Sequence, residues 1–210
     1  MRGHSSSSAS SPFVYTFLVN DATRSEVVSS DDEPLILVDT EDRQIGTLDK
    51  AACHDGQGRL HRAFSLFVFN RHGETLIQRR HSDKRLWPGY WSNGCCSHPR
   101  NGEIIEDAVV RRAEQELGLS VNPDFLFKFR YRATYLAMGS EFELCSVFVS
   151  HTADEPNVNA TEIAEWRWVA PHDLDREIEN DSITFTPWLQ IEWKRMRTEF
   201  LNEIQSLGAE

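Results

Sequence analysis

The sequence is poor in cysteine and has no long hydrophobic run. Four cysteines occur in 210 residues, and two of them, Cys95 and Cys96, are neighbours. Adjacent cysteines in so small a set do not make the disulfide framework of a secreted domain. No apolar segment is long enough to span a membrane. We therefore expect a cytoplasmic protein with reduced thiols and no membrane partner.

Positive charge is also scarce, because 22 lysines and arginines stand against 33 acidic residues and leave a net charge of −11. Such a surface repels nucleic acid and anionic lipid on average, so we expect no nucleic-acid partner. Basic residues do gather at residues 79–81, at Lys84 and Arg85, and at Arg100. This cluster indicates a site for a small anionic ligand, with a solvated basic turn as the alternative.

Length and composition predict one folded domain. The chain is 40% hydrophobic and contains six tryptophans, which is enough to bury a core without disulfides. Residues 1–33 are polar and begin with a serine-rich stretch, so we expect a disordered or variable N-terminal extension there. We expect residues 34–210 to form the functional domain.

Hydrophobic periodicity predicts more strands than helices. Alternating or continuous apolar runs predict strands at residues 35–38, 63–70, 75–79, 127–135, 142–149 and 163–169. Apolar positions three and four apart predict helices at residues 102–117, 171–178 and 189–207. We expect Glu103 in the first turn of the helix at 102–117, and Gly118 at its C-cap. Because the helices occur singly among strands, we expect an α/β (α+β) fold in which helices sandwich a mixed sheet.

Residues 87–99 combine tryptophan, cysteine and histidine in an unusual way for a core strand. If residues 92–98 are extended, Cys96 and His98 point to one side and Cys95 points to the other. A thiol and an imidazole would then share one wall. The alternative is a buried, unreactive cysteine beside a hydrogen-bonded histidine.

Three histidines and two glutamates are candidates for a metal site. His54 and His61 flank a short polar loop, and His98 follows the adjacent cysteines. Glu141 and Glu143 are two apart on a predicted strand, so they face the same way and repel unless a cation or proton lies between them. These five side chains would suit Mn²⁺, Zn²⁺ or Mg²⁺ in five or six coordination. Separately hydrogen-bonded histidines and a solvated edge strand are the alternative.

The predicted helix at 102–117 carries an altered Nudix box, the motif Gly-x5-Glu-x7-Arg-Glu-x2-Glu-Glu-x-Gly. In that box, glutamates on one helical face bind divalent metals that hold a diphosphate. Glu103 and Glu116 keep acidic positions, and Arg111 keeps the arginine. A glycine and two glutamates of the motif are replaced by Ser97, Arg112 and Gln115. The carboxylate cluster with which a hydrolase activates water is therefore incomplete.

Further motifs extend the similarity over most of the chain. They are Gly46-Thr47-Leu48-Asp49-Lys50 with His54, Arg59-Leu60-His61-Arg62-Ala63-Phe64, Gln78-Arg79-Arg80, Trp87-Pro88-Gly89-Tyr90-Trp91, Asn93 with Cys96-Ser97-His98-Pro99, Arg130-Tyr131-Arg132-Ala133, Glu141-Phe142-Glu143 and Pro187-Trp188. With these, the chain from about residue 35 to its last helix resembles the type 1 isopentenyl-diphosphate Δ-isomerases. The resemblance implies a Nudix-type fold, a mixed sheet sandwiched between helices.

The resemblance also implies an activity. Members of this family interconvert isopentenyl and dimethylallyl diphosphate by adding a proton at one end of the allylic unit and removing another from the opposite face. It implies that Cys96 and Glu143 are the two proton carriers, with Tyr131 assisting Glu143 and Trp188 offering a π face to the cation. Which of Cys96 and Glu143 is the acid stays open.

Binding roles follow from the same resemblance. One divalent metal would be held by His54, His61, His98, Glu141 and Glu143, with its identity open. The substrate diphosphate would be held by Lys50, Arg80, Lys84 and Arg112, and a Mg²⁺ by Glu116 and the substrate oxygens. We expect isopentenyl diphosphate as the partner molecule, and a monomer or weak dimer.

Two other functions compete with the isomerase. A Nudix hydrolase acting on a nucleoside diphosphate derivative would require acidic residues at Arg112 and Gln115. A silent metal- or diphosphate-binding module would bind metal but would not exchange hydrogen between substrate and water.

Overall fold

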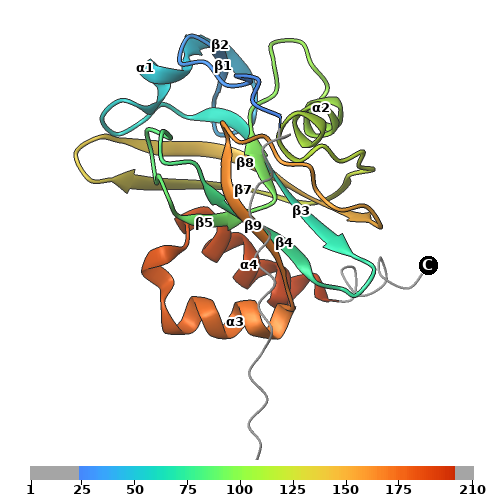
Figure 1. The fold of residues 1–210 in the computed structure, drawn as a ribbon. Coiled ribbons are helices and arrows are strands. Elements are labelled where there is room, and N and C mark those ends of the chain that lie inside the picture. The colour runs from blue at the N-terminus through green and yellow to red at the C-terminus, as the bar shows by residue number, and fades with distance from the viewer. Residues whose placement is uncertain (1–23, 202–210) are drawn as a thin grey trace, which may run out of the picture.

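The structure is a computed structural model that describes residues 24–201 (Figure 1). Its strands are β1 (Pro34–Val38), β2 (Gln44–Asp49), β3 (His61–Asn70), β4 (Thr75–Arg80), β5 (Trp91–Asn93), β6 (Cys95–Ser97), β7 (Asp124–Tyr135), β8 (Gly139–Thr152) and β9 (Ile163–Val169). Its helices are α1 (Lys50–His54), α2 (Ile105–Leu117), α3 (Pro171–Asn180), the 3-10 turn η1 (Ser182–Thr184) and α4 (Pro187–Glu199).

The strands form a mixed sheet centred on β3. This strand pairs in parallel with β8 and antiparallel with β1, β4 and β6, while β7 extends the sheet beyond β8 and β9 pairs with β4. β3 is buried along nearly its whole length, as expected of a strand covered on both faces. The β3–β8 register sets His61 opposite Glu143.

Helices cover both faces of the sheet, as Figure 1 shows with α2 on one side and α3 and α4 on the other. The period of two in β3 divides its side chains between the two layers. Phe64 and Leu66 pack in the core under α2, whereas Phe67 and Phe69 pack in the core under α3 and α4. The predicted sandwich of a mixed sheet between helices is confirmed.

The helix α2 ends where the sequence predicts but starts later. Gly118 forms its C-cap in the left-handed region, with φ of 65°. The predicted start at residue 102 is wrong by three residues. Gly102 has φ of 81°, in the left-handed region, so the helix begins only at Ile105. Glu103 therefore lies outside the first turn. It accepts hydrogen bonds from the backbone N–H of Arg100 at 2.7 Å and from Arg111 Nε at 2.7 Å.

Residues 24–33 have no helix or strand, but side chains and carbonyls tie them to the domain. Arg24 pairs with Glu114 at 2.9 Å, and the Glu26 carbonyl accepts a hydrogen bond from Asn159 Nδ2 at 2.8 Å. The division of the chain at residue 33 stays a prediction. Its part in residues 1–23, and the predicted helical positions Ile204 and Leu207, lie outside the described residues. None of the helices between residues 24 and 201 has the length and apolar character needed to cross a membrane.

Candidate active site

One cavity of about 700 Å³ brings together most of the residues that the sequence singled out. Residues 27–31 and the loop at 80–86 form part of its rim. The predicted site residues in its wall are Lys50, His54, Arg80, Lys84, Cys96, His98, Arg112, Tyr131, Glu141, Glu143 and Trp188. Two others stand behind the wall: His61 is completely buried, and Glu116 is paired with Arg112.

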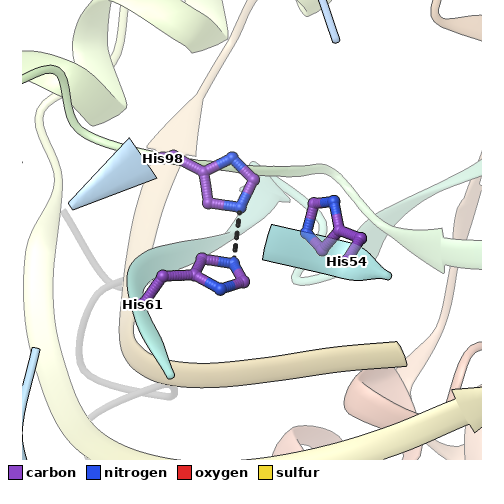
Figure 2. A group of neighbouring side chains, drawn as sticks. All are labelled: His54, His61 and His98. Atoms are coloured by element: carbon purple, nitrogen blue, oxygen red, sulfur yellow. Dashed lines mark hydrogen bonds between the residues drawn. The ribbon is translucent and has the colours of Figure 1, made fainter. Parts of the chain in front are cut away.

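The three predicted histidines converge from separate elements (Figure 2). His54 is the last residue of α1, His61 is the first of β3, and His98 directly follows β6. Their ring centroids lie 5.0 to 5.9 Å apart. The rings of His61 and His98 point their Nε2 atoms at each other across 3.2 Å, beside His54.

The glutamates of β8 complete this cluster. His54 Nε2 lies 2.9 Å from a carboxylate oxygen of Glu141. An oxygen of Glu143 lies 3.7 Å from His61 Nε2 and 3.6 Å from His98 Nε2. A divalent ion with bonds of about 2.1 Å holds neighbouring ligand atoms roughly 3 Å apart, so these spacings fit one central ion.

Burial and hydrogen bonding point to the same conclusion. His54 Nε2 and Glu141 Oε2 are buried, and within the described part of the chain they have only each other as polar partners, at 2.9 Å. The Arg59 carbonyl accepts a hydrogen bond from His61 Nδ1 at 2.8 Å, which turns the Nε2 lone pair toward the cluster. Burial, together with His61, holds the pKa of His98 well below its ordinary value, so this imidazole is neutral, as a metal ligand must be. The residues present therefore fit a divalent metal.

The two carboxylates of the cluster stay ionised despite their burial. Burial alone would raise the pKa of Glu141, but the charge and hydrogen bond of His54 outweigh it and lower that pKa. Burial likewise opposes ionisation of Glu143, and the interaction with His61 and the hydrogen bond from Tyr131 outweigh it and lower its pKa. The Tyr131 hydroxyl donates to Glu143 Oε2 at 2.8 Å. Glu143 is thus a fixed carboxylate at the cavity wall.

The adjacent cysteines face opposite sides, as the predicted alternation requires. Cys95 is fully buried in the core under α2, whereas Cys96 packs beside Tyr131 and Trp188 at the cavity. The Cys96 thiol donates to Asn93 Oδ1 at 3.0 Å. Burial raises the pKa of this thiol far above its ordinary value, so it is protonated.

Aromatic rings form the apolar part of the cavity. Trp188 lies in the first turn of α4, and its indole Nε1 donates to Ser92 Oγ at 2.9 Å, which fixes the ring plane. Its ring lies edge-on to Trp87 at a centroid distance of 5.3 Å. The Tyr131 ring is 6.5 Å away. A small hydrocarbon group in the cavity would meet π faces rather than water.

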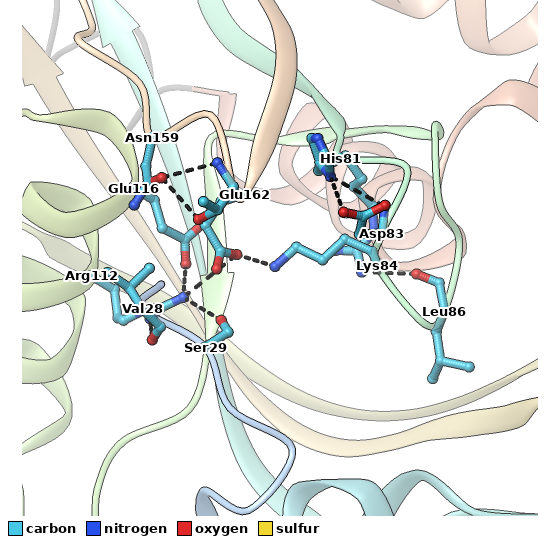
Figure 3. A network of polar contacts seen from close by, with 12 residues as sticks. Val28, Ser29, His81, Asp83, Lys84, Leu86, Arg112, Glu116, Asn159 and Glu162 are labelled. Carbon is cyan, nitrogen blue, oxygen red and sulfur yellow. Dashed lines mark hydrogen bonds and ion pairs between the residues drawn. The ribbon is translucent and has the colours of Figure 1, made fainter. Parts of the chain in front are cut away.

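The opposite part of the cavity is strongly charged (Figure 3). Lys84 pairs with Glu162, and Arg112 pairs with Glu116. Arg112 also donates from Nη1 to the Val28 carbonyl at 2.5 Å. Burial, together with the charge of Lys84, lowers the pKa of Lys50, as expected where cations crowd together.

The fourth predicted diphosphate ligand has other partners in this structure. Arg80 donates to the carbonyls of Leu86 at 2.9 Å and Trp87 at 3.1 Å. Its guanidinium also lies 5.3 Å from the centre of the Trp188 ring. Arg80 therefore joins the charged and the aromatic ends of the cavity.

Sequence reasoning missed residues that only the tertiary structure brings to the site. Glu162 lies in the cavity wall between Lys84 and Arg112, although it precedes β9 and belongs to no motif. Ser65 lies beside Cys96 because β3 and β6 pair at these two residues. Asn93, the hydrogen-bond partner of Cys96, could be identified from the sequence, because it belongs to the motif around that cysteine.

Comparison with known proteins gives a consistent result. The NUDIX domain family matches residues 59–189. Isopentenyl-diphosphate Delta-isomerase 1 of Photorhabdus laumondii is 45% identical over 77% of this chain and 93% of its own. The Kocuria rhizophila isopentenyl-diphosphate Delta-isomerase is 42% identical over 77% of this chain and 91% of its own. A crystal structure of a Deinococcus radiodurans protein covers 70% of this chain and 90% of its own, with 23% identity and a TM-score of 0.58, and supports the fold alone.

Proposed function

Because the chain belongs to the isopentenyl-diphosphate Delta-isomerase family and contains its NUDIX domain, we propose that its cavity interconverts isopentenyl and dimethylallyl diphosphate. The reaction moves a C=C bond by one position. A proton is added to the terminal carbon of the C=C bond, and another is removed from the CH₂ carbon that lies between the C=C bond and the CH₂ of the diphosphate ester. The diphosphate itself is unchanged.

The chemical difficulty is the low basicity of an alkene. Protonation creates a tertiary, carbocation-like transition state, which requires an acid, a base on the other face and the exclusion of water. Cys96, which is partly buried, and Glu143, which is buried, lie in the wall of the same cavity and are its two proton carriers in our proposal. This shared cavity is the observation that carries the proposal. The thiol is protonated and the carboxylate ionised, which suits one donor and one acceptor.

Tyr131 and Trp188 support these two groups. The hydroxyl of Tyr131 orients the Glu143 carboxylate through its hydrogen bond of 2.8 Å. The ring of Trp188, fixed by Ser92, offers π density to the developing cation. A desolvated cation–π contact contributes about 2 kcal/mol, or roughly thirtyfold in rate.

His54, His61, His98, Glu141 and Glu143 would hold one divalent ion, Mn²⁺, Zn²⁺ or Mg²⁺. Bound there, the ion would supply positive charge that fixes Glu143 and tunes its acidity. The chain's own contribution is to bury all five side chains and to hold their ligand atoms a few ångströms apart.

The charged end of the cavity would bind the diphosphate. Lys50, Arg80, Lys84 and Arg112 line it, and Glu116 would hold a Mg²⁺ together with substrate oxygens. Arg112 stands where the hydrolytic box has a glutamate, so a cation that clamps phosphate replaces a carboxylate that binds metal. We therefore propose that cleavage of the diphosphate is suppressed.

A single incubation separates the three candidate functions. Metal-loaded protein is mixed with Mg²⁺ and isopentenyl diphosphate, and the products are followed by ¹H and ³¹P NMR. The proposal predicts dimethylallyl diphosphate and no free phosphate. Release of phosphate would support a hydrolase, and unchanged substrate would support a silent binding module.

A further inference from the structure

The carboxyl group of Glu192 is buried without a cation. It lies on α4, one turn after Trp188, and is 0% exposed. Its Oε2 atom has no hydrogen-bond partner among the described residues. The groups in the described structure that shift its pKa include no positively charged side chain. An ionised carboxylate in such surroundings is costly, so the group is expected to carry a proton.

Small proton-bearing groups link this carboxyl to the cavity. Cys145 Sγ lies 3.6 Å from Glu192 Oε1 and 3.6 Å from Ser65 Oγ. Ser65 Oγ in turn lies 3.4 Å from Cys96 Sγ. Cys145 and Ser65 therefore bridge the Glu192 carboxyl and the cavity thiol.

The fold brings these groups together from four elements. Ser65 on β3 pairs with Cys96 on β6, and β8 runs parallel to β3 on its other side, where it carries Cys145. Helix α4 packs over this part of the sheet, and residues four apart on a helix share a face. Trp188 therefore reaches the cavity while Glu192 lies against the sulfur of Cys145.

We propose that Glu192 is a positioning residue of the isomerase: its protonated carboxyl, acting through Cys145 and Ser65, holds the Cys96 thiol and restores its proton. This inference deepens the proposed function and rests on it. Burial raises the pKa of Glu192 to about 8, which is consistent with a carboxyl that is still largely protonated near neutral pH.

The proton balance is simple in the direction in which Cys96 is the donor. The S–H bond of Cys96 breaks as the C–H bond of the product forms, leaving a thiolate. The Ser65 hydroxyl proton moves to the Cys96 sulfur, the Cys145 thiol proton moves to the serine oxygen, and the Glu192 carboxyl proton moves to the Cys145 sulfur. One proton has then passed from Glu192 to Cys96, and a carboxylate remains. If Cys96 is instead the acceptor, the same transfers run in reverse.

Glu192→Gln tests the proposal, because the amide keeps the shape but has no acidic proton. Glu199→Gln is the matched control, since Glu199 is exposed on the same helix and pairs only with Arg195 in the described structure. With metal-loaded enzyme, we expect kcat of Glu192→Gln to fall at least tenfold while KM stays within twofold, and Glu199→Gln to match the wild type. Ser65→Ala should lose kcat to a similar extent, because it breaks the link.

Infrared spectroscopy reads the carboxyl directly. The wild type and Glu199→Gln should show the C=O band of a buried, protonated carboxylic acid, and Glu192→Gln should lack it. Wild-type kcat in both Glu192→Gln and Ser65→Ala, or no such band in the wild type, would overturn the inference. A wild type that binds metal but does not isomerise would contradict the proposed function instead, and the band would still report whether Glu192 is protonated.

Discussion

Cys95 and Cys96 have the same side chain and adjacent positions, yet β6 sends them into different surroundings. Cys95 packs with aliphatic side chains under α2, and Cys96 faces the cavity. The direction of each could be predicted from the period of two in an extended chain. The same rule places Glu141 and Glu143 on one side of β8, where both line the cavity.

The first prediction compares Cys96 with Cys95, which serves as the control. Cys96→Ala removes one of the two proposed proton carriers, and general acid or base groups contribute about 10²–10⁴-fold. We expect turnover to fall at least 10²-fold in Cys96→Ala and to stay within about threefold in Cys95→Ala, as measured by product formation. The reverse ranking would show that Cys95 faces the substrate.

Glu192 gives a second prediction at this scale, a pH dependence of stability. Its pKa is about 8 in the folded protein, against an ordinary value of 4.5. Between these values the folded state keeps a proton that the unfolded chain releases. Stability therefore falls as pH rises from about 4.5 to 8, by at most about 1.4 kcal/mol per pH unit. The other titratable groups next to this carboxyl are Glu143 and Cys145 from β8 and Cys96 from β6. All three are present in both the wild type and Glu192→Gln, the two proteins to be compared.

Urea unfolding of the metal-loaded wild type and of Glu192→Gln, from pH 5.5 to 8, measures this effect. The free energy of unfolding of the wild type should decline relative to that of Glu192→Gln across the range. A constant difference would mean that Glu192 is already ionised at pH 5.5.

At the scale of elements, the sequence predicts what is local and misses what pairs over long distance. Gly118 identifies the end of α2, because a helix commonly ends at a left-handed glycine. The start of α2 depends on the turn at Gly102, which the periodicity of apolar residues does not register. The parallel pairing of β3 with β8 joins residues about 80 apart, and no local pattern specifies it. Ser65 reaches the site through the pairing of β3 with β6, Glu162 precedes β9, and Glu192 lies on α4, so these residues also escaped the sequence analysis because only long-range packing brings them to the site.

Helix α4 carries two tryptophans with different tasks, and this gives the third prediction. Trp188 lines the cavity, while Trp193 packs on Phe67 in the core and donates to Asp175 at 2.8 Å. Trp188→Phe offers a weaker π face and loses the hydrogen bond to Ser92, so kcat should fall about tenfold. Trp193→Phe should lower the unfolding temperature but keep kcat within twofold. Equal loss of kcat in both variants would indicate a general packing effect.

At the scale of the whole molecule, the proposed metal site ties together four parts of the fold. Its ligands come from α1, β3, β8 and the segment after β6, so metal binding should stabilise the folded state as a unit. The cytoplasmic location and the monomer or weak dimer expected from the sequence stay predictions.

The fourth prediction is that adding the metal to chelator-treated protein raises its unfolding temperature. At a free metal concentration 100 times Kd, the free energy of unfolding should increase by about 2.7 kcal/mol. His61→Ala should lose most of this increase, whereas His172→Ala, an exposed site on α3, should keep it. An increase of equal size in His61→Ala would place the metal elsewhere.

The central claim is that Cys96 and Glu143 exchange protons with the substrate inside one cavity, and isomerisation in heavy water tests it most directly. Metal-loaded protein is incubated with isopentenyl diphosphate in D₂O, and deuterium is located by NMR. We predict deuterium in one methyl group of dimethylallyl diphosphate for the wild type, and a loss of at least 10²-fold in the rate of labelling for Cys96→Ala and for Glu143→Gln. Product without deuterium, or wild-type labelling by either variant, would contradict the account.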